Sequence, residues 1–200
     1  MSKRLTASQR RAQLIDVGRG VFAKNGYEAT SVEEIARAAG VSKPIVYQHF
    51  GGKEGLHAVI VDREMEQVVD SVARAIAKGS PRSRFQAAVR AFLEYVQQHP
   101  DGFVVLARDT PTTGDGMSAV VADLGERISQ IFAGELEKAG HNARHAPIYA
   151  HALIGMVTAT GRWWMEQDGD FDLDEVAAHV AALGWMGLRH LPDAPDPVPT

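Results

Sequence analysis

Residues 40–53 combine cationic, hydroxyl, apolar and aromatic side chains in a spacing that suits contact with DNA. The ammonium group of Lys43 can donate to guanine N7 or O6, and the apolar faces of Pro44 and Ile45 can meet a thymine methyl group. The hydroxyl group of Tyr47 and the nearby ammonium groups suit phosphate oxygens. These residue types predict a surface that reads DNA.

Two short helices are predicted to position these side chains. The first ends at about Ala39, and the second runs from Lys43 to Phe50. Residues 40–42 supply a glycine for a tight bend, an apolar plug and a serine cap. Val46 and Phe50 are four residues apart and can face the core together, which leaves Lys43, Pro44 and Tyr47 on the other side. The pattern is a helix-turn-helix, whose second helix lies in the major groove with its N-terminal residues at base edges.

Helical periodicity dominates the rest of the chain, and no segment alternates convincingly as a strand does. A first helix should end at Asn25–Gly26, although Gly18 and Gly20 within it each cost about 1 kcal/mol relative to alanine. Thr30 and Ser31 offer hydroxyl caps for the second helix. Further helices are expected at Lys53 to about Lys78, Arg82–Gln98, Phe103–Asp109, Met117–Gly140, Ala146–Gln167 and Leu173–Leu191.

Composition and charge limit the class of protein. The chain has 200 residues, 45% of them hydrophobic, and no cysteine, which excludes disulfides and thiolate zinc sites. No apolar run approaches the roughly 20 residues that span a bilayer, so we expect a soluble, cytoplasmic protein. The net charge is -4, but the first 53 residues hold nine Lys and Arg against four Asp and Glu. This asymmetry favours a basic N-terminal part that binds nucleic acid, followed by an acidic remainder of the chain.

Residues 30–56 read TSVEEIARAAGVSKPIVYQHFGGKEGL. This string resembles the DNA-binding signature of the tetracycline-repressor (TetR/AcrR) family, and the preceding VFAKNGYEAT resembles the end of that family's first helix. The resemblance implies an all-α fold of about nine helices. It implies a three-helix helix-turn-helix domain at residues 1–53 and a helical ligand-binding and dimerisation domain at residues 54–191. Residues 192–200 are rich in proline and are expected to be a disordered tail.

The resemblance also implies residue roles. Thr30 and Ser31 would contact phosphate at the start of the second helix, and Tyr47, His49 and Lys53 would also bind backbone phosphates. Lys43, Pro44 and Ile45 would approach bases. Ile45 replaces a residue that is commonly small in the family, which leaves the operator sequence open. The arginines at positions 4, 10 and 11 could add an arm along the DNA. The predicted DNA-binding residues are Thr30, Ser31, Ser42, Lys43, Pro44, Ile45, Tyr47, Gln48, His49 and Lys53.

The family resemblance implies a dimeric repressor that a small hydrophobic inducer releases from a palindromic operator. The candidate pocket residues are apolar or aromatic, although plain core packing explains any one of them as well. Trp163 and Trp164 are adjacent on a helix, so the two indoles cannot point the same way. The predicted lining is Phe92, Tyr95, Val96, Phe103, Leu106, Val121, Leu124, Ile128, Trp163 and Trp164.

Other functions have weaker support in the sequence. A transcriptional activator of the same fold and a helical protein-interaction module stay open as alternatives. No phosphate-binding loop, nucleophile elbow or supported pair of carboxylates is present, so we expect neither an enzyme nor a cofactor. His141 and His145 lack a third metal ligand nearby, and the acidic residues 168–174 lack the spacing of a calcium loop. We expect no metal site and interpret the acidic segment as a solvated helix cap.

Overall fold

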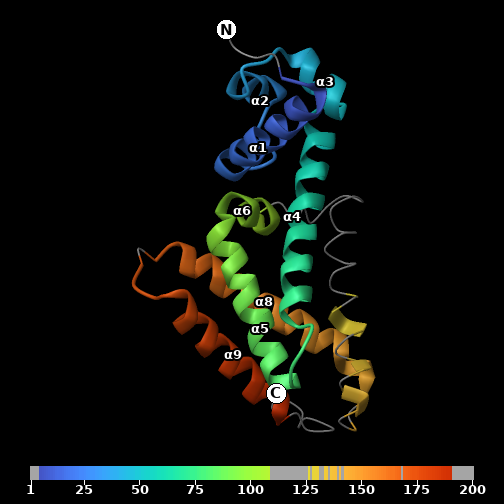
Figure 1. Cartoon of the computed structure of the whole chain (residues 1–200), viewed down its shortest axis with the longest axis vertical. Helices are drawn as coiled ribbons and strands as arrows, with labels where there is room; N and C mark the ends of the chain where they lie inside the picture. Colours follow the sequence, from blue (N-terminus) through green and yellow to red (C-terminus); the bar gives the residue numbers. More distant parts are fainter. Residues whose placement is uncertain are drawn as a thin grey trace, which may run out of the picture. The chain divides into compact units, whose positions relative to one another are not determined.

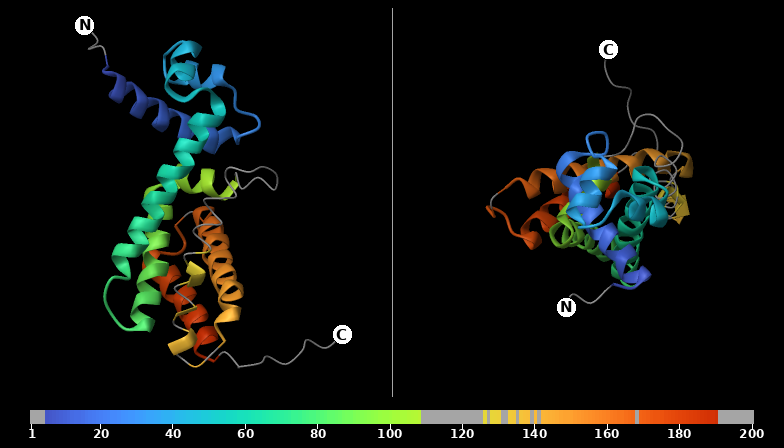
Figure 2. Two further views of the ribbon diagram at one scale, coloured as in Figure 1. Left: turned by 90° about the vertical axis from the view of Figure 1, so that its right-hand side faces the viewer. Right: turned by 90° about the horizontal axis from the view of Figure 1, so that it is seen from above.

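Helices form every regular element in the part of the chain that the structure describes. The structure is a computed structural model, and it describes residues 5–108, 126, 128–130, 133–134, 136–138, 140, 142–167 and 169–190. The chain divides into two compact units, of which the first comprises Met1–Gln67 with His99–Val120 and the second Val68–Gln98 with Val121–Thr200. The predicted all-α fold is confirmed (Figures 1 and 2).

Each unit is built from helices that the caps and glycines of the sequence delimit. The first unit contains α1 (Ala7–Asn25), α2 (Val32–Ala38), α3 (Lys43–Phe50), the first part of α4 (Lys53–Ala75) and α6 (Pro100–Arg108). The second unit contains the rest of α4, α5 (Pro81–Gln98), the short 3-10 helix η1 (Ala143–His145), α8 (Ala146–Met165) and α9 (Leu173–Arg189). No helix among the described residues is both long enough and apolar enough to cross a membrane.

Helix α1 begins at Ala7, before the arginines at positions 10 and 11 that were predicted to form an arm along the DNA. The Thr6 hydroxyl accepts from the Gln9 N–H, and the Gln9 side chain accepts from the Thr6 N–H, which together make a capping box. Arg10 and Arg11 therefore lie within the helix, so the predicted arm is wrong at these two positions. The helix ends at Gly26, whose φ of 79° is a backbone conformation that glycine adopts without strain.

The core of the first unit joins α1, α2, α3, α4 and α6. Leu14, Ile35, Val46 and Leu56 are fully buried there, and Val105 of α6 packs into the same cluster. Such residues recur along each helix at three- and four-residue spacing, which gives each helix one apolar face. The helix-turn-helix therefore rests on a contiguous core to which the distant segment α6 contributes.

Gly18 is explained by the packing of α1 on α4. A Cβ atom at Gly18 would lie 2.8 Å from Leu56 Cδ2 and 3.2 Å from Ile60 Cδ1. Contacts this short are tighter than van der Waals packing allows, so the two helices approach closely only because this side chain is missing. At Gly20 the nearest atom, Asp101 Oδ2, would be 3.6 Å from an added Cβ, which is an ordinary contact.

Two polar contacts tie α1 to its neighbours in the first unit. The guanidinium of Arg19 donates to the buried carboxylate of Glu64 at 2.8 Å, and Arg108 donates to the Ala23 carbonyl oxygen at 3.0 Å. Burial alone would lower the pKa of Arg19, but its hydrogen bond to Glu64 and the Glu64 charge leave this pKa raised above its ordinary value. Arg108 also places a cation at the C-terminal end of α1, where the helix dipole favours positive charge.

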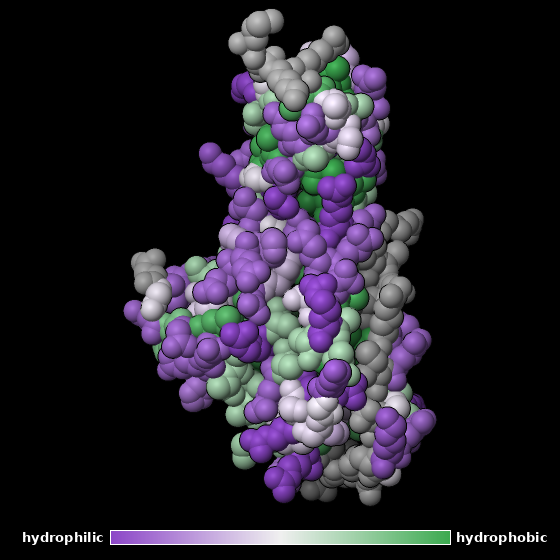
Figure 3. All heavy atoms as spheres, viewed as in Figure 1, coloured by the Kyte–Doolittle hydropathy of each residue, from purple (hydrophilic) through white to green (hydrophobic). Residues whose placement is uncertain are grey.

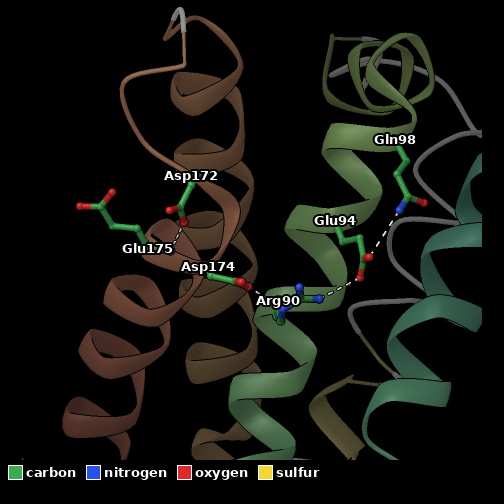
Figure 4. A network of polar contacts seen from close by, with 6 residues as sticks. All are labelled: Arg90, Glu94, Gln98, Asp172, Asp174 and Glu175. Atoms are coloured by element: carbon green, nitrogen blue, oxygen red, sulfur yellow. Dashed lines mark hydrogen bonds and ion pairs between the residues drawn. The ribbon is translucent and has the colours of Figure 1, made fainter.

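The second unit has its own core between α5, α8 and α9, which lie side by side in Figure 1. Leu93 is fully buried in it, and Gly184 gives room to the ring of Phe85, whose Cζ would lie 2.7 Å from an added Cβ. At the surface, Arg90 bridges α5 and α9 by donating to Asp174 at 2.8 Å and to Glu94 at 3.1 Å (Figure 4). Hydrophilic side chains cover most of the molecular face in Figure 3.

Most predicted helix bounds agree with the structure to within a few residues. The bounds of α3 are those predicted, while α4 ends at Ala75 and α6 begins at Pro100, three residues earlier than expected in each case. Proline suits the first turn of a helix because its missing N–H would have no partner there. The predicted helix at residues 117–140 lies partly outside the described residues, and its described residues are helical up to Lys138. The tail at residues 192–200 lies wholly outside them.

Candidate nucleic-acid interface

The local backbone of α2, the turn and α3 follows from three sequence features. Ser31 caps α2 in a capping box with Glu34, as predicted for this serine. Gly40 takes a φ of 64°, and the Val41 N–H then donates to the Ala36 carbonyl oxygen at 2.9 Å. Helix α3 ends at Gly51, whose φ is 75°. The turn therefore holds α3 at a defined angle to α2 through its own backbone bonds.

The two sides of α3 differ sharply in exposure. Val46 is fully buried against the core, whereas the neighbouring Tyr47 side chain is 54% exposed. Phe50 packs partly on the core, and the Arg11 guanidinium lies 4.7 Å from the centre of its ring. The predicted inward position of Val46 and outward position of Tyr47 are confirmed. An exposed tyrosine beside an anchored helix face is available for a partner.

Five of the predicted DNA-contacting residues gather at the start of α3 and on its outward side. Ser42, Lys43, Pro44, Tyr47 and Gln48 are exposed. Ser42 precedes α3 but makes no capping hydrogen bond with its side chain, so the predicted serine cap is wrong. The hydroxyl, ammonium and amide groups in this set can all donate to nucleic acid.

Two further predicted contacts are less exposed than this set. Ile45 packs partly against the core of the first unit, and His49 is half-buried. The exposed part of the predicted DNA-contacting surface in the free protein thus centres on Lys43, Pro44 and Tyr47.

Three predicted phosphate contacts are engaged inside the protein. The Thr30 hydroxyl is buried and donates to the Gly26 carbonyl oxygen at 2.7 Å. Lys53 donates to the Tyr27 carbonyl oxygen at 2.9 Å, and its Nζ lies 4.2 Å from the centre of the Tyr27 ring. Ser31 serves the capping box described above. In the free protein these three side chains therefore stabilise the segment that joins α1 to α2.

Sequence reasoning missed two residues that shape the predicted DNA-contacting surface. Gly52 has a φ of 139°, which residues with a side chain rarely adopt, and the Tyr47 ring lies beside it, since an added Cβ would be 3.4 Å from Tyr47 Cε1. Glu33 of α2 forms an ion pair with Lys43 of α3 across the turn. The double glycine could have pointed to the first residue, but no local pattern pairs residues ten positions apart on two helices.

Two family models match successive parts of the chain. The model described as "Bacterial regulatory proteins, tetR family" matches residues 14–60, and the model described as "Tetracyclin repressor-like, C-terminal domain" matches residues 81–187. The chain belongs to the tetR family. The chain is therefore a transcriptional regulator of the TetR type, as its signature at residues 30–56 predicts.

Similar proteins support the same family over nearly the whole chain. The HTH-type transcriptional activator FasR of Mycolicibacterium smegmatis is 30% identical over 191 residues, which cover 94% of this chain and 87% of FasR. A TetR-like transcriptional regulator from Rhodococcus sp. RHA1 is 28% identical with a TM-score of 0.76, covering 94% of this chain and 100% of that one. FadR from Bacillus subtilis, solved in complex with stearoyl-CoA, shares the TetR fold at 19% identity and a TM-score of 0.74, covering 86% and 96%.

The predicted ligand-lining residues of this TetR protein fall in both units. Phe103 and Leu106 lie on α6, where Phe103 is buried and Leu106 packs on the core of the first unit. Val121 and Leu124 lie outside the described residues, and Ile128 is half-buried in the second unit. A ligand role for any of these residues stays a prediction.

The remaining candidates lie on α5 and α8 of the second unit. Tyr95 and Val96 are buried, and Phe92 packs against the core cluster of that unit. Trp164 is 8% exposed and donates from Nε1 to the Phe171 carbonyl oxygen at 2.9 Å, whereas Trp163 is 45% exposed. The prediction that the two indoles point apart is confirmed.

The remaining polar residues considered in the sequence analysis are the acidic segment 168–174 and the histidines at positions 141 and 145. Asp172 caps α9 by accepting from the Glu175 N–H at 2.8 Å, as the helix-capping interpretation predicts (Figure 4). His145 precedes α8 at its N-terminal cap position, while His141 and Asp168 lie outside the described residues. Within the described residues, no three His, Asp or Glu side chains come together as a metal site.

The capping box of α2 predicts a specific pH dependence. The pKa of Glu34 lies below its ordinary value of 4.5 because the Ser31 N–H and the Ser31 hydroxyl donate to its carboxylate. The ionised form therefore stabilises the fold above the unfolded-state pKa, and this contribution is lost as the pH falls through the folded-state pKa. Glu34→Gln keeps a capping side chain but cannot titrate.

We expect wild-type protein to unfold at a slightly higher temperature than Glu34→Gln at pH 7, and the difference to vanish as the pH falls below 4.5. Thermal unfolding of both proteins at pH 7, 5, 4 and 3 measures it. A difference that stays constant over this range would show that the Glu34 charge contributes nothing.

Proposed function

We propose that this TetR-family regulator is a homodimeric repressor that binds a palindromic operator through α3 and leaves it when a small hydrophobic inducer binds. The observation that carries the DNA-binding part is the exposed start of α3, where Lys43, Pro44 and Tyr47 project from a helix whose other side is buried. A recognition helix presents its N-terminal residues to base edges in the major groove. Tyr47, His49 and Ser42 would contact phosphates at the edges of that groove.

Dimerisation is supported by apolar side chains on the surface of the second unit. Ile148 of α8 and Leu183 and Met186 of α9 are 64%, 68% and 64% exposed, which is high for side chains of this size. Exposed apolar surface of this kind marks association sites. A dimer would place two recognition helices on half-sites one helical turn or a multiple of it apart, and joint binding would multiply the affinity of each.

Control by a ligand requires two states of the dimer that bind the operator with different affinity. An inducer shifts their balance only through its own difference in affinity for the two states. Helix α4 is continuous from the first unit into the second, so it links the recognition helix covalently to the candidate ligand-binding unit. The proposed regulator has no catalytic activity, and it binds its DNA in the cytoplasm.

Selection from a random DNA pool tests the DNA-binding part. Full-length protein is expected to enrich an inverted repeat, and light scattering is expected to give two chains per bound duplex. Enrichment of a single half-site with one bound chain would overturn the dimer, and failure to enrich any sequence would overturn sequence-specific binding. Screening apolar small molecules for release of the enriched duplex then tests the inducer.

Activation is the second candidate function, because the relative FasR is named a transcriptional activator. Transcription in vitro from a promoter that carries the enriched repeat separates the two. Repression predicts fewer transcripts as protein is added and recovery when the ligand is present. More transcripts on addition of protein would replace repression with activation and leave the DNA-binding proposal intact.

A further inference from the structure

One contact of the reading surface runs between the two helices of the helix-turn-helix. Lys43, the first residue of α3, forms an ion pair with Glu33, the second residue of α2. Both side chains are about half exposed, at 49% and 48%. The other acidic residue in the first turn of α2, Glu34, is occupied by the Ser31 capping box. Glu33 is therefore the carboxylate that restrains the predicted base-reading lysine.

The number of donors on a lysine makes this restraint compatible with base reading. An ammonium group has three N–H donors, so Lys43 can keep one bond to Glu33 and direct others to guanine N7 and O6. Phosphates line the edges of the major groove, whereas base edges lie on its floor. A Lys43 side chain that turned from a base to a phosphate would leave Glu33 as an unpaired negative charge close to the DNA.

We propose that Glu33 is a positioning residue that makes operator recognition selective by holding Lys43 for base contact and away from the phosphates of other sequences. The inference rests on the proposed DNA-binding function and deepens it. Non-specific affinity comes from cations that neutralise phosphates, whereas specificity is a difference between two affinities. A carboxylate that keeps one cation away from phosphate lowers the affinity for non-specific DNA and leaves the affinity for the operator unchanged.

The test compares Glu33→Gln with wild-type protein on the enriched duplex and on a random duplex of the same length. In Glu33→Gln, Lys43 is free to reach phosphate, so we expect affinity for random DNA to rise by about 3- to 10-fold at low salt. Operator affinity should change by less than about twofold, so the specificity ratio falls. The salt slope on random DNA should steepen by up to about 0.9 for each dimer half, which is one added phosphate contact.

Glu28→Gln is the matched control, because it removes the same charge from an exposed position in the same unit. It should shift both affinities equally and only slightly. Lys43→Met supplies a second background: without the lysine, Glu33→Gln should no longer raise random-DNA affinity. Thermal unfolding of each variant checks that the first unit is folded, as expected for substitutions at exposed positions.

Three results would overturn the inference alone. The first is an equal gain of Glu33→Gln on operator and random DNA, and the second is a gain that persists in the Lys43→Met background. Loss of operator affinity in Glu33→Gln with no change on random DNA would also overturn it, because Glu33 would then read a base itself. If wild-type protein binds no DNA in a salt-sensitive way, the proposed function fails and this inference fails with it.

Discussion

Replacing Tyr47 with alanine is expected to weaken operator binding at least about tenfold, which corresponds to about 1.4 kcal/mol. The Tyr47 side chain is 54% exposed on α3, and its ring lies against Gly52, so the hydroxyl is held outside the core. A hydrogen bond to a charged partner such as phosphate contributes about 1.5–3 kcal/mol, and each dimer loses two of them. Titration of wild-type and Tyr47→Ala protein onto the enriched duplex measures the loss.

The same substitution should leave the fold intact. Exposed substitutions away from caps and cores change the free energy of unfolding by about 0.5 kcal/mol or less. Tyr47→Phe is the matched control, since it keeps the ring against Gly52 and removes only the hydroxyl. We expect Tyr47→Phe to retain part of the affinity that Tyr47→Ala loses. Wild-type affinity in Tyr47→Ala would contradict the assignment of α3 as the reading helix.

Gly18→Val should lower the free energy of unfolding by about 1–3 kcal/mol, the usual cost of overpacking a core. A Cβ atom at this position already lies 2.8 Å from Leu56 Cδ2, and valine adds two methyl groups beyond it. Leu56 and Ile60 are fully buried and cannot move aside without disturbing their own neighbours. Chemical denaturation of the purified variant measures the effect.

Gly20→Val is the matched control for this prediction. It lies two residues away on the same helix, and the nearest atom to an added Cβ is Asp101 Oδ2 at 3.6 Å. Valine is slightly better than glycine within a helix, so its effect should stay within about 0.5 kcal/mol. Equal destabilisation by both valines would mean that the approach of α4 does not set the cost at Gly18.

The helix-turn-helix could be predicted from sequence because its determinants are local. Gly40 bends the chain, Ser31 caps α2, and Gly51 ends α3, each within one turn of the element that it defines. The alternation of exposed Tyr47 with buried Val46 follows from helix periodicity alone. For the same reason the family signature at residues 30–56 was sufficient to predict the family.

Contacts between distant segments could not be predicted in the same way. Gly18 looked costly in isolation, because its explanation is Leu56, 38 residues later in the sequence. Lys53 looked like a phosphate contact, but in the free protein it bonds to Tyr27 at the end of α1. Trp164 matched a pocket lining by composition, yet its Nε1 bonds to the Phe171 carbonyl oxygen within a core. Residue type alone does not distinguish such packing from binding.

One footprinting titration tests the central claim, that α3 makes this chain a sequence-specific DNA-binding regulator. Purified full-length protein is titrated onto the DNA that flanks its own gene, at about 50 and 200 mM salt, with random DNA as competitor. The account predicts saturable protection of an inverted repeat, with affinity that falls at least about tenfold at the higher salt. Protection no stronger than on random DNA at either salt, for this DNA and for the selected pool alike, would contradict it.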